Sequence, residues 1–116
     1  MRPLFGILVL LIGACAVEPN RDDPYEAPPE YAPWYRDVET CAHRSGSFAR
    51  LSFFRLDSLD YRAGHREGNS IWIRPPFFTT RRVVEHEMLH TLIGDPEHAR
   101  PEWVDCGLSP AQVWTP

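Results

Sequence analysis

The residues His86-Glu87-Met88-Leu89-His90 lie inside an apolar run that extends from Val83 to Ile93. Residues four apart lie on one face of an α-helix, so the imidazoles of His86 and His90 can converge on a single ion. Glu87 projects about 100° further around the helix axis, within reach of a water on that ion. Apolar residues cover most of the remaining circumference, which is typical of a buried helix. The sequence therefore predicts a buried helix that carries half of a metal site.

The two histidines and the glutamate need partners if this helix is buried. Leaving two imidazoles and a carboxylate unpaired would cost several kcal/mol, whereas a divalent ion with its water would satisfy all three. The spacing H-E-x-x-H resembles that of the zincin family of zinc metallopeptidases. This resemblance implies that His86 and His90 bind Zn²⁺ and that Glu87 is the catalytic base. The alternative is an incidental pair of histidines on a solvated helix face.

A third ligand is expected soon after the helix, because a catalytic zinc usually takes three protein ligands and one water. The metzincin branch of the zincins has the pattern H-E-x-x-H-x-x-G-x-x-H and a methionine beneath the metal downstream. Here Gly94 follows His90 by four residues instead of three, His98 follows it by eight instead of six, and no later methionine exists. The chain is therefore metzincin-like with divergent spacing. We expect His98 to be the third ligand, ahead of Asp95 and then Glu97.

The reaction that the resemblance implies is hydrolysis of a peptide bond by a zinc-bound water that Glu87 activates. Other enzyme classes lack support, because the chain has no glycine-rich phosphate loop, no nucleophile elbow and no lysine for a Schiff base. A formal net charge of -4 argues against nucleic acid as a partner. The alternative function is a non-catalytic zinc-binding lipoprotein that acts as a binding or structural module, since so short a domain leaves little room for a substrate cleft.

The chain begins like a secretory signal. Arg2 precedes the apolar segment from Leu4 to Ile12, which is too short to span a bilayer. The residues Leu11 to Cys15 also resemble the bacterial lipobox, in which cleavage precedes a cysteine that becomes lipid-modified. We therefore expect a signal peptide over residues 1–14 and a lipid anchor on Cys15 that holds the protein at the membrane in the cell envelope, either in the outer membrane or at the periplasmic or cell surface. The alternative is an ordinary signal peptide.

Residues 15–32 are rich in proline and acidic residues, which predicts an extended tether from the membrane. The alternative is an arm packed on the domain through Tyr25 and Tyr31. The remaining residues, 33–116, suffice for one small domain, expected to be a monomer.

Two cysteines remain once Cys15 is assigned to the lipid. In a secreted protein Cys41 and Cys106 are then expected to form a disulfide. Because the core of so small a domain is marginal, this bond would matter for stability. The alternative is that Cys106 is a metal ligand.

The pattern of the domain predicts an α+β fold, with a helix from Pro33 to about Gly46, a few-stranded sheet and the buried metal helix. The segment from Phe48 to Leu56 has the alternating pattern of a strand. The residues from Asp57 to Asn69 are polar and predict a loop. Within that loop, His65 or Tyr61 could reach the cleft and stabilise an oxyanion.

A second strand is expected at Ile71, Trp72 and Ile73, before Pro75. Proline cannot continue a strand ladder, which favours an edge strand. In zincins the strand before the active-site helix commonly lines the cleft, and an exposed edge can bind an extended peptide as a further strand. These three residues are therefore the candidate substrate-binding strand. An interior strand is the alternative.

Overall fold

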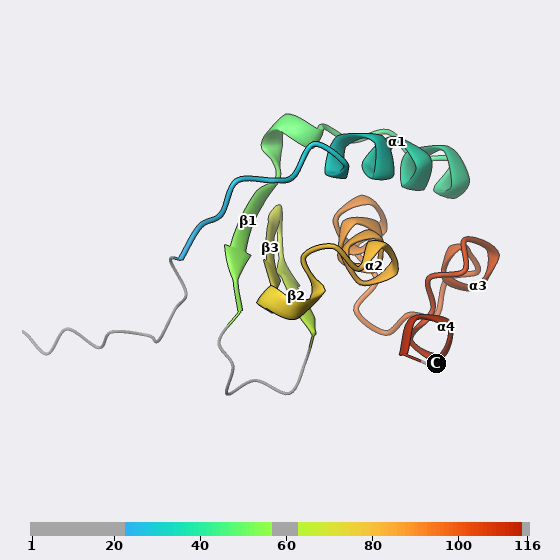
Figure 1. The fold of residues 1–116 in the computed structure, drawn as a ribbon. Helices are drawn as coiled ribbons and strands as arrows, with labels where there is room; N and C mark the ends of the chain where they lie inside the picture. The colour runs from blue at the N-terminus through green and yellow to red at the C-terminus, as the bar shows by residue number, and fades with distance from the viewer. Residues whose placement is uncertain (1–22, 57–62, 115–116) are drawn as a thin grey trace, which may run out of the picture.

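The computed structural model describes residues 23–56 and 63–114, and the mixed helix and sheet content confirms the predicted α+β class (Figure 1). The signal peptide over residues 1–14 and the lipid site at Cys15 lie outside the described residues. In chain order the elements are helix α1 (Tyr31–Ala42), the 3-10 turn η1 (Phe48–Arg50), strands β1 (Ser52–Arg55), β2 (Gly64–Glu67) and β3 (Ser70–Ile73), the 3-10 turn η2 (Pro75–Phe77), and helices α2 (Arg81–Ile93), α3 (Glu102–Asp105) and α4 (Pro110–Trp114).

The three strands form a mixed sheet in the order β1-β3-β2, in which β3 pairs in parallel with β1 and antiparallel with β2. The expectation that Ile71, Trp72 and Ile73 form the edge is therefore wrong, and all three side chains are buried. Pro75 begins η2, so it ends the strand and removes no hydrogen bond from the ladder. The edge nearest to α2 is β2, which formed from the polar stretch that predicted a loop.

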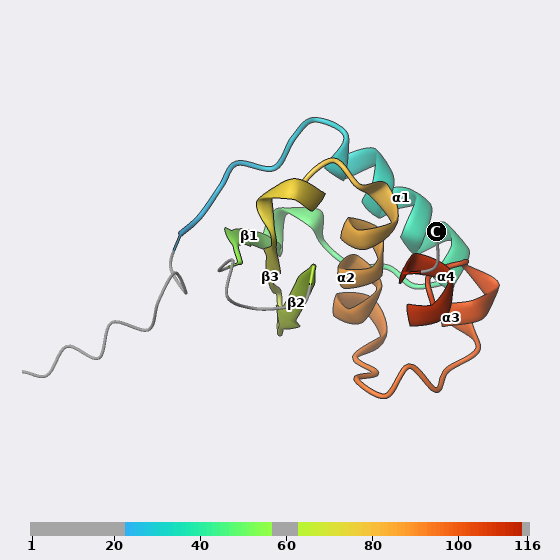
Figure 2. The ribbon, with the colours of Figure 1, turned by 60° about the horizontal axis from the view of Figure 1, so that its bottom comes forward.

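Helix α2 lies between the sheet and the C-terminal helices, with α1 packed along it (Figures 1 and 2). Seven consecutive residues from Val83 to Leu89 are buried, which confirms the predicted buried helix. The helix joins two parts of the core. On one side Val84 and Met88 pack with the sheet and the start of α1, and on the other side Leu89 packs with residues of α1 and the C-terminal segment.

Helices α1 and α2 each end at a residue in the left-handed conformation. Gly94 follows α2 with a φ of 58°, a left-handed conformation that glycine adopts without steric cost. Helix α1 ends earlier than expected, at Ala42, because His43 adopts the left-handed conformation with a φ of 52°. The disulfide between Cys41 and Cys106 is present and confirms the predicted pairing.

Residues 23–32 pack on the domain, so the prediction of a free tether over residues 15–32 is wrong for this part. The ring of Tyr25 stacks on Phe78 with ring centroids 4.1 Å apart. Tyr31 is fully buried and its hydroxyl donates to the carbonyl of Phe78 at 2.6 Å. Burying two aromatic rings outweighs the cost of ordering a proline-rich segment. The rest of the expected tether lies outside the described residues.

Across residues 23–56 and 63–114, no helix is both long enough and apolar enough to cross a membrane.

Candidate metal centre

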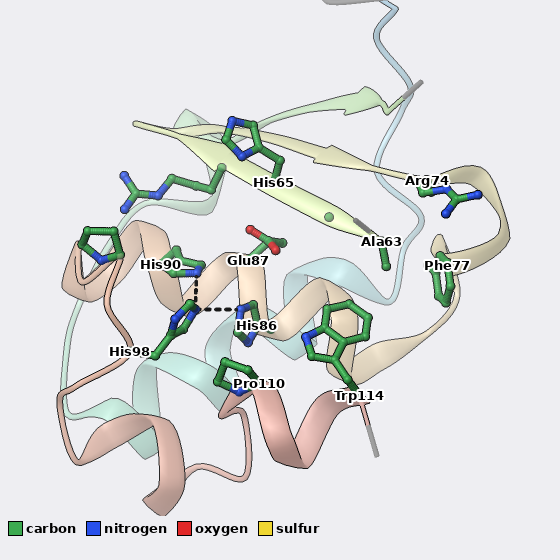
Figure 3. A pocket seen from close by; sticks show the side chains of 13 residues that line it. Ala63, His65, Arg74, Phe77, His86, Glu87, His90, His98, Pro110 and Trp114 are labelled. Carbon is green, nitrogen blue, oxygen red and sulfur yellow. Dashed lines mark hydrogen bonds between the residues drawn. The ribbon is translucent and has the colours of Figure 1, made fainter. Parts of the chain in front are cut away.

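The side chains of three histidines point toward one another (Figure 3). His86 and His90 lie one turn apart on α2, and His98 comes from the loop that follows it. The Nε2 atom of His98 lies 3.0 Å from Nε2 of His90 and 3.2 Å from Nε2 of His86. The ligand atoms of the three residues lie within 4.8 Å of one another. We refer to these three residues as the histidine triad.

A hydrogen bond sets the tautomer of His86. Its Nδ1–H donates to the backbone carbonyl of Leu108 at 2.6 Å, which leaves the lone pair of Nε2 directed at the other two rings. Metal-binding histidines usually donate their second ring nitrogen in this way, because the bond orients the ring and raises its basicity. The residues that follow α3 thus orient a ligand on α2.

The environment of His86 and His90 keeps these two imidazoles neutral. Burial lowers the pKa of His86 to about 4, with a smaller contribution from the neighbouring His98. Burial, the other two histidines and the charge of Arg66 lower the pKa of His90 to about 3. Neutral imidazole is the form that binds metals, so near pH 7 the protein does not have to lose protons at these two rings to accept an ion.

Trp103 packs beneath all three histidines. Its side chain is fully buried, and its ring centroid lies 4.8 Å from that of His86, 4.5 Å from that of His90 and 4.6 Å from that of His98. One aromatic surface therefore limits the rotation of every ring in the triad.

Asp95 organises the loop that carries His98. Its carboxylate accepts hydrogen bonds from the amides of Glu97 and Arg100 and from Nε1–H of Trp103. The Arg100 amide is the main cause of the lowered pKa of Asp95. These bonds hold His98 in place although its φ of 55° is unusual for a residue with a side chain. The alternative ligands Asp95 and Glu97 are not part of the group whose atoms converge.

Glu87 is buried and lies on the wall of the same cavity, beside the triad (Figure 3). Gly64 of β2 leaves space for its side chain. A Cβ atom at position 64 would lie 2.9 Å from both Cγ and Oε1 of Glu87, which is too close for ordinary contact. The absence of a side chain on β2 therefore allows the carboxylate to lie between the strand and α2.

The cavity has a volume of about 660 Å³. Strand β2 forms one wall, α2 and the loop with His98 form the opposite wall, and Phe77 and Trp114 lie at one end (Figure 3). The candidate substrate-binding residues Ile71, Trp72 and Ile73 do not line it, because their strand is central in the sheet and the cavity lies beside the edge strand β2. His65 does line it, whereas Tyr61 lies outside the described residues.

The donor set fits a transition metal. Zinc binds imidazole nitrogens at about 2.0 to 2.1 Å, which places two ligands of a tetrahedral site about 3.4 Å apart. The two shortest distances in the triad, 3.0 and 3.2 Å, are close to that separation. The three histidines could therefore hold a metal ion, and all three line the cavity. Cys106, the alternative ligand, is in the disulfide.

Comparisons of the chain with models of protein families, with curated proteins and with solved structures found no match.

No local sequence pattern assigns several of the residues around the triad to this site. The partner of His86 is the carbonyl of Leu108, and every residue has a carbonyl. Trp103 could have been noticed as a large apolar residue five positions after His98, in a polar segment. Gly64 reads as a loop glycine until its distance to Glu87 is known.

Proposed function

We propose that this protein is a zinc metallopeptidase that hydrolyses peptide bonds in the cavity between β2 and α2. The observation that carries the proposal is the convergence of His86, His90 and His98 beside a buried glutamate on the wall of an open cavity. Three histidines and an open position are a common ligand set of catalytic zinc, whereas structural zinc sites are usually closed by four protein ligands.

A zinc ion held by the triad would supply a Lewis acid for the scissile carbonyl and would lower the pKa of a water molecule. Glu87 is the base that takes a proton from the attacking water as its oxygen bonds to the carbonyl carbon. The same carboxylate then gives the proton to the amine as the carbon–nitrogen bond breaks. Trp103 and Asp95 keep the ligands oriented but take no part in the transfer.

The edge of β2 is the candidate substrate-binding strand, in place of Ile71–Ile73. Its residues Gly64, His65 and Arg66 line the cavity, and among the strands that the structure describes β2 pairs only with β3. An extended peptide that added to the other edge of β2 would place its backbone alongside Glu87 and the triad. Peptides bound in this way are recognised mainly through main-chain hydrogen bonds.

The proposal for the location rests on the N-terminal sequence. We propose that cleavage before Cys15 and its lipidation anchor the protein in the cell envelope. Asp23 already contacts the domain through a hydrogen bond from the amide of Arg55, and seven residues, 16–22, lie between it and Cys15. The peptidase would therefore act close to a membrane surface.

Replacement of Glu87 by glutamine tests the function. The change removes the base but preserves size, so we expect zinc content near one ion per chain with hydrolysis of a peptide library reduced at least about a thousandfold. Metal analysis by mass spectrometry and cleavage-site mapping are the measurements. Asp105→Asn, an exposed change of the same chemical type, is the control.

Two outcomes would contradict the proposal. Purified protein that binds no transition metal at stoichiometric level would remove its basis. If wild type binds zinc but its cleavage of the library matches that of Glu87→Gln, the protein is a zinc-binding module and not an enzyme.

A further inference from the structure

The charges that line the cavity differ from those of the rest of the chain. Among residues 23–56 and 63–114, the charged side chains at its wall are the guanidinium groups of Arg66 and Arg74 and the carboxylate of Glu87. The wall is therefore net positive, and a divalent ion on the triad would add to that charge. The complete chain has a formal net charge of -4. An acidic protein with a positive cavity attracts anionic ligands to that cavity.

The two arginines lie at different ends of the wall. Arg74 follows β3, its amide donates to the carbonyl of Ala63 at 2.9 Å, and its side chain lies near Phe77 (Figure 3). Arg66 is two residues beyond Gly64 on β2, so both lie on the same face of the strand. In the ladder Arg66 lies opposite Ile71, whereas Arg74 follows Ile73, so the two arginines are offset along the sheet.

Neither arginine has an ion-pair partner within residues 23–56 and 63–114. Other arginines of the same region are paired: Arg81 binds Asp37 at 2.6 Å, and Arg100 binds Glu102 at 3.1 Å. The side chains of Arg66 and Arg74 are only partly exposed, so a carboxylate ligand would replace only part of their hydration. A guanidinium group presents donors in a planar fork that matches a carboxylate.

We propose that the substrates are acidic peptides, with one carboxylate side chain bound by Arg66 and another, across the scissile bond, bound by Arg74. This inference rests on the proposed peptidase function, because it assumes that a peptide lies along β2. The backbone of the peptide would bind the strand edge, and the two carboxylates would set its register relative to Glu87. Peptides with basic residues at the same positions would be repelled.

Binding to the zinc-loaded Glu87→Gln variant tests this inference without hydrolysis. The probes are fluorescein-labelled decapeptide pools of degenerate sequence in which two positions, one to three residues apart, are fixed as glutamate, glutamine or lysine. Fluorescence anisotropy should show that the best glutamate pool binds about tenfold more tightly than its glutamine counterpart, and the lysine pool more weakly still. The preference should decrease as salt is raised.

Arginine variants in the same background locate the preference. We expect Arg66→Gln and Arg74→Gln each to reduce the preference for glutamate, and the double variant to abolish it, with zinc content unchanged. Arg50→Gln, which changes an exposed arginine of η1 outside the cavity, is the matched control and should retain it.

Four outcomes are distinguishable. Equal binding of the glutamate and glutamine pools, or no measurable binding of any pool, would overturn the inference. A preference that survives in the double variant would mean that the metal captures the carboxylate, and would also overturn it. Hydrolysis of neutral and acidic pools at equal rates by the wild type would overturn the inference and leave the peptidase function in place. A preference for glutamate that depends on both arginines, with no hydrolysis by the wild type, would support the acidic-peptide site and refute the peptidase.

Discussion

The two walls of the cavity are built in different ways. On the wall formed by α2 and the C-terminal segment, His86 and Glu87 are buried, and each ring of the histidine triad contacts Trp103. On the wall formed by β2, the side chains of His65 and Arg66 are partly exposed. The two walls therefore differ in how far their side chains are buried. The first wall brings together three histidines that could hold a metal ion, and the second presents partly exposed side chains to the cavity.

The wall formed by α2 and the C-terminal segment depends on contacts between residues that are distant in sequence. Trp103 contacts the three rings of the triad, and the carbonyl of Leu108 accepts a hydrogen bond from His86. The disulfide of Cys106 joins this segment to α1. Changes in this segment should therefore alter metal affinity, although most of its residues are not ligands. Changes in β2 should alter activity or selectivity and leave the metal in place.

Replacing His98 by alanine should have the largest effect. Structural zinc sites gain about 10 to 16 kcal/mol from four ligands, so the loss of one ligand should weaken zinc binding on the order of a thousandfold. Competition with a chelating indicator measures this affinity. The control is His65→Ala, which removes a histidine of the opposite wall and should leave the affinity unchanged. Tight binding by His98→Ala together with loss of affinity in Glu97→Gln would make Glu97 the third ligand.

Replacing both Cys41 and Cys106 by serine should lower the free energy of unfolding by about 4 kcal/mol, because the disulfide closes a loop between residues 65 positions apart. Urea denaturation measures this change. Reduced wild-type protein should unfold at nearly the same urea concentration as the double variant. Zinc should also bind more weakly, since the segment below the triad loses its link to α1. Unchanged zinc affinity would show that this segment is held by packing alone.

Trp103→Phe should weaken zinc binding by about 10- to 100-fold, the usual effect of changing a residue that orients metal ligands. The variant keeps an aromatic ring but loses the N–H that donates to Asp95. The control is Trp34→Phe on α1, whose ring stacks on Tyr31 and has no contact with the triad. That change should lower stability and leave zinc affinity intact. Equal zinc affinities in both variants would refute a positioning role for Trp103.

Gly64→Ala should have the smallest effect and test the wall formed by β2. The added methyl group would displace the carboxylate of Glu87, so we expect kcat/KM to decrease by about tenfold with zinc affinity unchanged. Steady-state kinetics and zinc titration of the same preparation provide both values. A loss of zinc from this variant would show that the two walls are not independent.

The elements that could be predicted have a local cause. The helix over Arg81–Ile93, its end at Gly94 and the shared face of His86 and His90 follow from helical periodicity and from the conformational freedom of glycine. The disulfide followed from the cysteine count and from the expectation that the protein is secreted. The distances in the triad depend on the path of the loop after α2, which the sequence does not fix. For this reason Asp95 and Glu97 remained alternatives to His98 as the third ligand.

The elements that were missed depend on partners far away in the chain. Strand β2 is polar because one side of it faces the cavity, so no period of two revealed it. The central position of β3 depends on pairing with both β1 and β2, and Pro75 suggested an edge only because its place after the strand was unknown. The packing of Tyr25 and Tyr31 depends on Phe78, about fifty residues later.

By itself the sequence determined that two histidines which could bind a metal lie on one helix with a glutamate next to the first of them, because this spacing is a matter of local geometry. Only the tertiary structure decided which further side chain joins them, what lies beneath them and which strand faces them. These depend on contacts between segments that are distant in the chain. Such contacts form only when the whole core packs, so no local pattern encodes them.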